Sequence, residues 1–210
     1  TVALKLLPEG MAASPEARRR LLREARAASV LDHPGVATVF DVGDADGLLY
    51  IAAACVEGET VSDLAAREPF SIAEGLRVAI AACEVLAHAH EHGVIHRDIT
   101  GRNIMVARDG RVVVLDFGLA LPEGTTRLTS TGAVLGTVAY MAPEVVQGRA
   151  ADARSDLYWL GVVLYEMLTG TVPFLGPRAE AVMYALIHEP PEPPGARRSG
   201  LPLELNRVLL

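Results

Sequence analysis

Two short polar segments constrain the fold of this chain more than any other feature: HRDITGRN at residues 96–103 and DFG at 116–118. Apolar runs lie between them, joined by an Asp-Gly pair of the kind that closes a tight β-hairpin. We therefore predict a hairpin over residues 104–115, with one polar segment entering it and the other leaving it. This arrangement places the polar segments on neighbouring loops at one end of a small sheet.

The side chains on these loops suit a metal-dependent transfer reaction. Asn103 and Asp116 each offer an oxygen ligand, and Mg²⁺ prefers a few such oxygens together with phosphates and water. Mn²⁺ is the alternative ion. Asp98 lies outside that pair and can accept a proton from a hydroxyl nucleophile. All three are residue types that are common in turns, but their joint spacing makes independent turn formers the weaker interpretation.

Outside these loops, the hydrophobic pattern changes from strands early in the chain to helices later. A capping box at Ser71 and Glu74 marks the start of a long helix that we expect to end near residue 92. The other expected elements are strands at 1–7, 36–42, 48–55 and 94–96, and helices at 15–29, 61–67, 154–169 and 177–188. This order predicts an α+β protein with two unequal lobes.

We expect the two lobes to meet near residue 57. Residues 1–56 would form part of a small β-rich N-terminal lobe, with a lysine-bearing strand, the first helix and a hinge strand. Residues 57–210 would form a mostly helical C-terminal lobe that carries the polar loops. The first residue falls inside an expected strand and the last inside an expected helix, so we expect the chain to be cut at both ends.

Composition excludes several classes of protein. The net charge is −7, which argues against an electrostatic nucleic-acid partner. The two cysteines favour reduced thiols in the cytoplasm over a disulfide scaffold. The most apolar stretch, residues 157–168, is too short and too charged to cross a bilayer, so no membrane contact is expected within the chain. We expect a cytoplasmic domain, either free or belonging to a membrane-anchored parent.

The HRD-x4-N and DFG segments, with MAPE at 141–144 and VALK at 2–5, resemble the signature set of protein kinases. Their order and spacing also fit, and the resemblance covers essentially the whole chain. The loop sequence RLTSTGAVLGT is similar to that of bacterial, eukaryotic-like serine/threonine kinases. The resemblance implies the bilobal kinase fold and Mg²⁺-dependent transfer of the ATP γ-phosphoryl group to Ser or Thr hydroxyls of protein substrates.

The resemblance implies a role for each residue that matches a motif. Lys5 would hold the α- and β-phosphates of ATP, and Glu24 on the first helix would pair with Lys5. Asp98 would be the catalytic base, while Asn103 and Asp116 would hold Mg²⁺. Lys5 is the only lysine among 19 basic residues, which suggests that this site needs a compact ammonium instead of a broad guanidinium.

The strand before the hinge would contact adenine. By resemblance, Ala53 would be the gatekeeper behind the base, and it is unusually small for the family. The backbones of Ala54 and Val56 would hydrogen-bond to adenine, and Met105 would lie under its ring. We therefore expect the pocket to accept ATP analogues with bulky substituents on N6.

The segment that follows DFG would carry regulation and substrate choice. Thr137 would contact Asp98, as in serine/threonine kinases. Arg97 would receive a phosphorylated loop residue, and Thr129 and Thr131 match threonines that related bacterial kinases autophosphorylate. A homodimer is one arrangement in which one copy could phosphorylate the loop of the other.

Two departures from the family keep other functions open. Thr100 stands where most serine/threonine kinases carry a lysine that touches the γ-phosphate, although Arg102 is near enough in sequence to supply a charge. The glycine-rich loop that precedes the lysine strand in the family is not in the chain. The alternatives are a catalytically weak pseudokinase that acts as an ATP-binding scaffold, and a small-molecule kinase of the aminoglycoside-phosphotransferase kind. The latter lacks the GT…APE segment that is present here.

Overall fold

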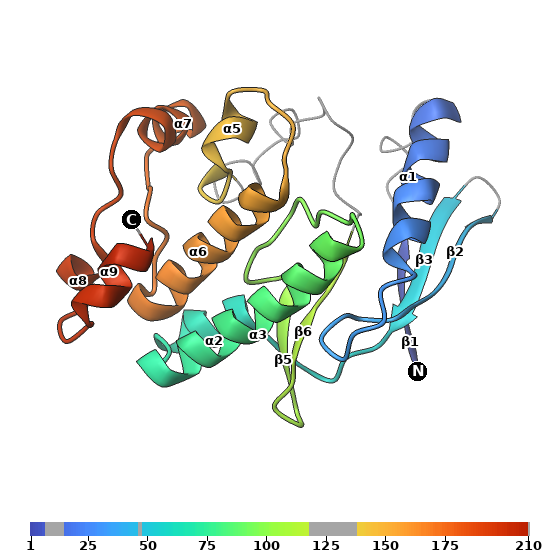
Figure 1. Ribbon diagram of the computed structural model, residues 1–210, viewed down its shortest axis with the longest axis horizontal. Helices are drawn as coiled ribbons and strands as arrows, with labels where there is room; N and C mark the ends of the chain where they lie inside the picture. The colour runs from blue at the N-terminus through green and yellow to red at the C-terminus, as the bar shows by residue number, and fades with distance from the viewer. Residues whose placement is uncertain (7–14, 46–47, 118–137, 210) are drawn as a thin grey trace.

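A computed structural model describes residues 1–6, 15–45, 48–117 and 138–209 of the chain (Figure 1). Its first sheet is antiparallel, with the strand order β1-β3-β2, where β1 is Val2–Leu6, β2 is Val39–Ala45 and β3 is Leu48–Ala54. Helix α1 (Pro15–Ala28) covers one face, where its Ala25 meets the buried Leu49 and Ile51 of β3. The predicted helix and strands of this region are confirmed, with the second strand beginning three residues later than expected.

The strand register decides which β1 side chains face α1. Lys5 lies opposite Ile51 and Ala3 lies opposite Ala53. Because neighbours across an antiparallel ladder share a face, Lys5 and Ala3 lie on the same face of the sheet as Ile51. The lysine is thereby directed to the face of the sheet that α1 covers.

The second sheet contains the predicted hairpin. Its strands β5 (Ile104–Ala107) and β6 (Val112–Val114) pair antiparallel, and β4 (Gly58–Thr60) pairs with the outer edge of β5. Strand β4 was not expected, because a short polar run gives no alternating pattern. Gly58 is required there, since a Cβ at this position would lie 2.3 Å from the carbonyl oxygen of Val106.

The segment at 94–96 is not a strand, contrary to the sequence-based prediction. The amide of Val94 donates to the carbonyl of Ala89 in the preceding helix, and the amide of His96 donates to the side chain of Asp156 in a later helix instead of to a neighbouring strand. A β-like sequence pattern therefore produced a loop whose hydrogen bonds are made to a helix.

The other regular elements of the described chain are helices. They are α2 (Val61–Arg67), α3 (Ile72–Glu91), α5 (Pro143–Val146), α6 (Ala153–Thr169), α7 (Ala179–His188), α8 (Pro194–Arg197) and α9 (Leu203–Leu209). The capping box predicted at Ser71 and Glu74 is present. The short helices α5 and α8, each with proline in its first turn, were not predicted. Among the described residues, none of the helices combines the length and apolarity needed to cross a membrane.

The main hydrophobic core lies between α3 and α6 and extends to the second sheet. Figure 1 shows these helices side by side in the middle of the molecule, with α1 and the first sheet at one end and α7, α8 and α9 at the other. The loop before β2 joins the two parts, because the amide of Val114 in β6 donates to the carbonyl of Gly35. The loops that carry the polar segments lie between the first sheet and the helices.

Candidate active site

The loop from residue 96 to 103 connects α3 to β5, and a buried carboxylate of α6 holds it. The two carboxylate oxygens of Asp156 accept from the backbone amides of His96 and Arg97, each at 2.9 Å. The imidazole Nε2 of His90 lies 2.7 Å from the same carboxylate, which is fully buried. Arg97 has a φ of 68°, a backbone conformation that is strained for a residue with a side chain. The bonds to Asp156 therefore hold the loop in a shape that it would not adopt alone.

His96 links this loop to the DFG segment. Its Nε2 lies 2.7 Å from the carbonyl oxygen of Leu115, and its Nδ1 accepts from the amide of Asp98 at 3.2 Å. This pattern requires a proton on Nε2 alone. Burial lowers the pKa of His96, which agrees with a neutral ring. The ring also meets Phe117 edge to face, with 4.7 Å between the ring centroids.

Asp98 and Asn103 lie together in this loop, and both are partly buried. The side-chain nitrogen of Asn103 donates to the backbone carbonyl of Asp98 at 2.7 Å and to its carboxylate at 3.2 Å. The amide of Leu115 donates to the carbonyl of Asn103 at 2.8 Å, which fixes the start of β5 against the end of β6. These bonds orient the Asp98 carboxylate. They also direct the side-chain nitrogen of Asn103 toward Asp98, and a nitrogen of an amide is not a metal ligand.

Lys5 reaches this loop cluster from the first sheet. Its Nζ lies 2.6 Å from Oδ2 of Asp116, and both side chains are partly exposed, at 45% and 35%. An ion pair this exposed contributes only about 0–1 kcal/mol, so phosphate oxygens could replace it at little cost. The Glu24 backbone belongs to α1, but its side chain lies outside the described residues. The expected pairing of Lys5 with Glu24 therefore stays a prediction.

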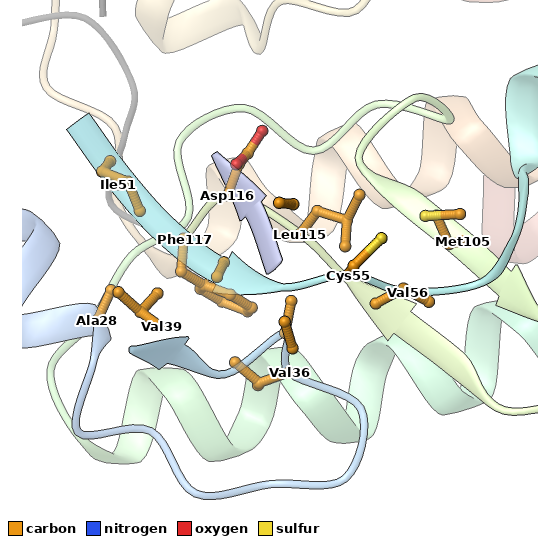
Figure 2. A pocket seen from close by; sticks show the side chains of 14 residues that line it. Ala28, Val36, Val39, Ile51, Cys55, Val56, Met105, Leu115, Asp116 and Phe117 are labelled. Carbon is orange, nitrogen blue, oxygen red and sulfur yellow. The ribbon is translucent and has the colours of Figure 1, made fainter. Parts of the chain in front are cut away.

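An apolar cavity of about 180 Å³ opens beside Asp116. Its lining comes from both sheets and α1: Ala3, Ala28, Val36, Ala37, Val39, Ile51, Ala53, Ala54, Cys55, Val56, Met105, Leu115, Asp116 and Phe117. Figure 2 shows Met105 and Val56 at one end of the cavity and Ile51 with Ala28 toward the other. The predicted adenine contacts, at positions 53, 54, 56 and 105, all lie on its wall. Apolar walls with one carboxylate at the edge suit a flat aromatic base attached to a charged group.

The remaining predicted residues are placed only in part. Thr129, Thr131 and Thr137 lie outside the described residues, so their expected roles are untested. Arg97 follows His96 directly and its side chain is half-buried. The structure thus brings Lys5, Asp98, Asn103 and Asp116 to one place, without testing the role of each.

Several partners were missed by sequence reasoning. His90 of α3 contacts Asp156. Helical spacing puts His90 on a different face of α3 from His88 and His92, which was a clue in the sequence that its role differs from theirs. Shortly before α5, the hydroxyl of Tyr140 donates to Glu166. The pKa of Tyr140 is strongly raised, mainly because the side chain is buried and secondly because of this hydrogen bond. Contacts of this kind join distant parts of the chain, so the local sequence does not identify the partner.

The fold and the loop cluster are suited to hold a phosphate-bearing nucleotide in the apolar cavity, near the Asp98 carboxylate. Comparison with known families agrees, since the pattern that defines the protein kinase domain matches residues 1–193. The chain therefore belongs to the protein kinase family, and it has that family's α+β fold.

The chain is also similar to individual bacterial proteins of this family. The chain is 40% identical over its whole length to serine/threonine-protein kinase PknB of Mycolicibacterium smegmatis and of Mycobacterium tuberculosis. It is 39% identical to serine/threonine-protein kinase PrkC of Bacillus subtilis. It spans only 35%, 34% and 32% of these three relatives. Among solved structures, a mutant of the PknI kinase domain of Mycobacterium tuberculosis matches with a TM-score of 0.76 at 30% identity, covering 100% of this chain and 76% of that one.

Proposed function

We propose that this chain is the catalytic domain of a serine/threonine protein kinase, which transfers the ATP γ-phosphoryl group to Ser or Thr hydroxyls of proteins. The observation that carries the proposal is the joint placement of a carboxylate base and a lysine–aspartate pair at the edge of an apolar cavity. Asp98 is oriented by Asn103, and Lys5 meets Asp116 beside the cavity. The names of the relatives support Ser and Thr as acceptors.

The chemistry follows from the placement of these groups. During transfer, the bond between the γ-phosphorus and its bridging oxygen breaks, and a bond to the acceptor oxygen forms. Asp98 accepts the proton that the acceptor hydroxyl loses. Lys5 binds phosphate oxygens and exchanges its contact with Asp116 for them. Positioning and charge neutralisation account for most of the catalysis in this reaction class.

The oxygen donors present fit a magnesium ion. Asp116 supplies a partly exposed carboxylate at the cavity edge, and Asn103 supplies an amide oxygen from the neighbouring loop. A hard cation that keeps several water and phosphate ligands needs only this small number of protein oxygens. When bound there, Mg²⁺ would neutralise charge on the transferred phosphate.

The decisive experiment compares the full-length protein with its Asp98→Asn variant in transfer of radiolabelled phosphate from ATP to a generic basic protein. Loss of the base should lower the rate about 10²–10⁴-fold. Asp109→Asn, in the exposed turn of the β5–β6 hairpin, removes the same charge away from the site and should keep the rate. No transfer by wild type would favour a pseudokinase scaffold instead. Equal transfer by wild type and Asp98→Asn would contradict the role of Asp98 as the base.

We further propose that phosphorylation of Thr129 and Thr131 activates the domain through Arg97, with one copy of the chain acting on another. Support comes from the resemblance of the loop sequence to that of bacterial kinases. A mixture of active protein with a size-tagged Asp98→Asn variant should place phosphate on the loop of the inactive copy, as seen by mass spectrometry. A loop that stays unmodified in active protein would contradict this proposal.

A further inference from the structure

Three histidine rings lie next to one another where the loop before β2 meets α3, and the proposed chemistry uses none of them. His33 belongs to that loop, His88 lies in the last turn of α3, and His92 caps the C-terminal end of that helix. The ring centroids of His33 and His88 are 5.2 Å apart, and those of His88 and His92 are 4.4 Å apart. These three residues, the histidine cluster, therefore connect the loop to α3 through titratable side chains.

The loop before β2 also forms part of the nucleotide cavity. The amide of Ala37 donates to the carbonyl of Val114 at 3.2 Å, and the amide of Val114 donates to the carbonyl of Gly35 at 2.8 Å. Gly35 packs so closely on α3 that a Cβ there would lie 2.4 Å from Cγ2 of Val85. Because Val36 and Ala37 line the cavity, the position of this loop determines one of its walls.

The hydrogen bonds of the histidine cluster decide which ring nitrogens carry protons. The amide of Gly35 donates to Nδ1 of His33 at 3.0 Å, so this nitrogen cannot bear a proton while that bond exists. Nδ1 of His92 lies 2.8 Å from the carbonyl oxygen of His88, a contact that needs a proton on Nδ1 and suits a charged ring equally well. Nε2 of His88 is buried and has no hydrogen-bond partner. The closed loop therefore accommodates a charge on His92 but not on His33, and a charge on His88 would lie beside that of His92.

Other charged groups around the histidine cluster do not offset this effect. Arg111 donates to the carbonyl of Pro34 and pairs with Asp109, while His90 contacts Asp156. The remaining charged side chains on the elements packed against the cluster are those of Arg26, Asp32, Glu84 and Glu91, all exposed. Among the described residues no carboxylate forms an ion pair with any of the three rings. Exposed charges without such a contact are screened by water and salt.

We propose that the histidine cluster is a pH-sensitive switch, which holds the loop before β2 against α3 above about pH 6.5 and releases it in mild acid. Once the loop has left α3, the bond from Gly35 is broken and the rings are apart and hydrated, so that His33 and His88 can both be charged. The open loop then binds more protons than the closed one. Below pH 6.5 each additional proton shifts the balance toward the open loop by up to about tenfold per pH unit. Only the effect of this opening on ATP rests on the proposed kinase function.

The test measures amide hydrogen exchange of residues 31–37 by mass spectrometry in the full-length protein at pH 5.5 and 7.5, corrected for the intrinsic effect of pH on exchange. Wild type should lose protection in this segment at pH 5.5. His88→Phe keeps an aromatic ring between its neighbours without a charge, and should keep the protection at both pH values. In His33→Asn the side-chain oxygen can still accept from the amide two residues later, so this variant should also lose the pH dependence.

His188→Gln, on the exposed face of α7, is the matched control and should behave as wild type. His90 and His96 are unchanged in every variant, so their titration is common to all. Equal loss of protection in wild type, His88→Phe and His33→Asn would overturn the switch. Greater protection of wild type in acid would do so too, because a charged cluster would then hold the loop more tightly.

Nucleotide binding tests the functional consequence of the switch. The dissociation constant of a fluorescent N-methylanthraniloyl derivative of ATP, measured with Mg²⁺, should rise between pH 7.5 and 5.5 by up to about tenfold more in wild type than in His88→Phe. An equal rise in both proteins would mean that the loop does not control the cavity. If the derivative bound at neither pH, the proposed kinase function would be rejected, while the exchange measurement would still decide whether the switch exists.

Discussion

At the scale of single residues, several side chains in the lining of the apolar cavity are small. Ala53 lies on the wall next to Ile51, with Ala28 of α1 also in the lining. Replacing a larger side chain by alanine leaves room for several heavy atoms in a close-packed interior. We therefore expect room beside Ala53 for a substituent on the base.

This gives a prediction for Ala53→Met. An ATP analogue with a benzyl group on N6 should compete with ATP in wild type, because the substituent can enter the space beside Ala53. The methionine should weaken competition by about 10–200-fold, while the KM for ATP itself changes little. Inhibition constants measured in the transfer assay decide the matter. An analogue that competes equally against both proteins would show that Ala53 does not limit the cavity.

His96 provides a prediction for pH. Its ring is fully buried and neutral, and burial lowers its pKa from the ordinary value of 6.5. Below pH 6.5 the unfolded chain takes up a proton that the folded chain does not. The free energy of unfolding should then fall by up to about 1.4 kcal/mol per pH unit, and this contribution should be absent above pH 6.5.

Denaturant unfolding between pH 5 and 8 measures that slope. His96→Gln should lower the free energy of unfolding at every pH. Below pH 6.5 it should also make the dependence of that free energy on pH less steep, because the unfolded variant takes up about one proton fewer. His188→Gln, on the exposed face of α7, gives the baseline for removing a histidine elsewhere. Identical slopes for wild type and His96→Gln would refute the contribution of the buried ring.

At the scale of elements, the shape of the loop from residue 96 to 103 depends on α6. Asp156 satisfies two loop amides and the imidazole of His90 from a fully buried position. Asp156→Asn keeps the size of the side chain but has one acceptor oxygen in place of two. We expect the free energy of unfolding to fall by about 2–4 kcal/mol, because at least one buried amide loses its partner.

Activity should fall together with stability in that variant. If the strained backbone at Arg97 relaxes, the next residue, Asp98, changes position as well. Asp152→Asn is the matched control, because it removes the same charge from the exposed N-terminus of the same helix. Urea unfolding measures the loss of stability, and kcat measures the loss of activity. A variant at position 156 that unfolds and reacts like the control would show that the loop does not depend on this carboxylate.

These elements also show what the sequence could and could not predict. The hairpin and the capped helix α3 have local signals in turn residues and periodicity, and the structure confirms them. The segment 94–96 was predicted wrongly, because the amide of His96 pairs with Asp156, a residue 60 positions away, and not with a strand. The contact of Lys5 with Asp116 spans 111 positions, and motif spacing alone did not reveal it.

At the scale of the whole molecule, the candidate nucleotide site exists only where two sheets meet. Ala3 and Ile51 come from the first sheet, while Met105 and Leu115 belong to the hairpin region. A ligand that contacts both must stabilise their relative arrangement, because it binds the folded chain and not the unfolded one. Nucleotide binding should therefore raise the thermal unfolding midpoint.

The size and metal dependence of that rise form the last prediction. With ATP and Mg²⁺ at about 100 times the dissociation constant, the stabilisation should be about 2.7 kcal/mol, or about 5–10 °C for a chain of this length. Chelation of the metal should reduce the shift strongly, since the phosphate charges would then face the Asp116 carboxylate without a cation between them. Asp116→Asn should make the shift insensitive to the metal, whereas Asp109→Asn should behave as wild type. A shift that is equally large in the presence of chelator would mean that ATP binds through the apolar cavity and Lys5 alone.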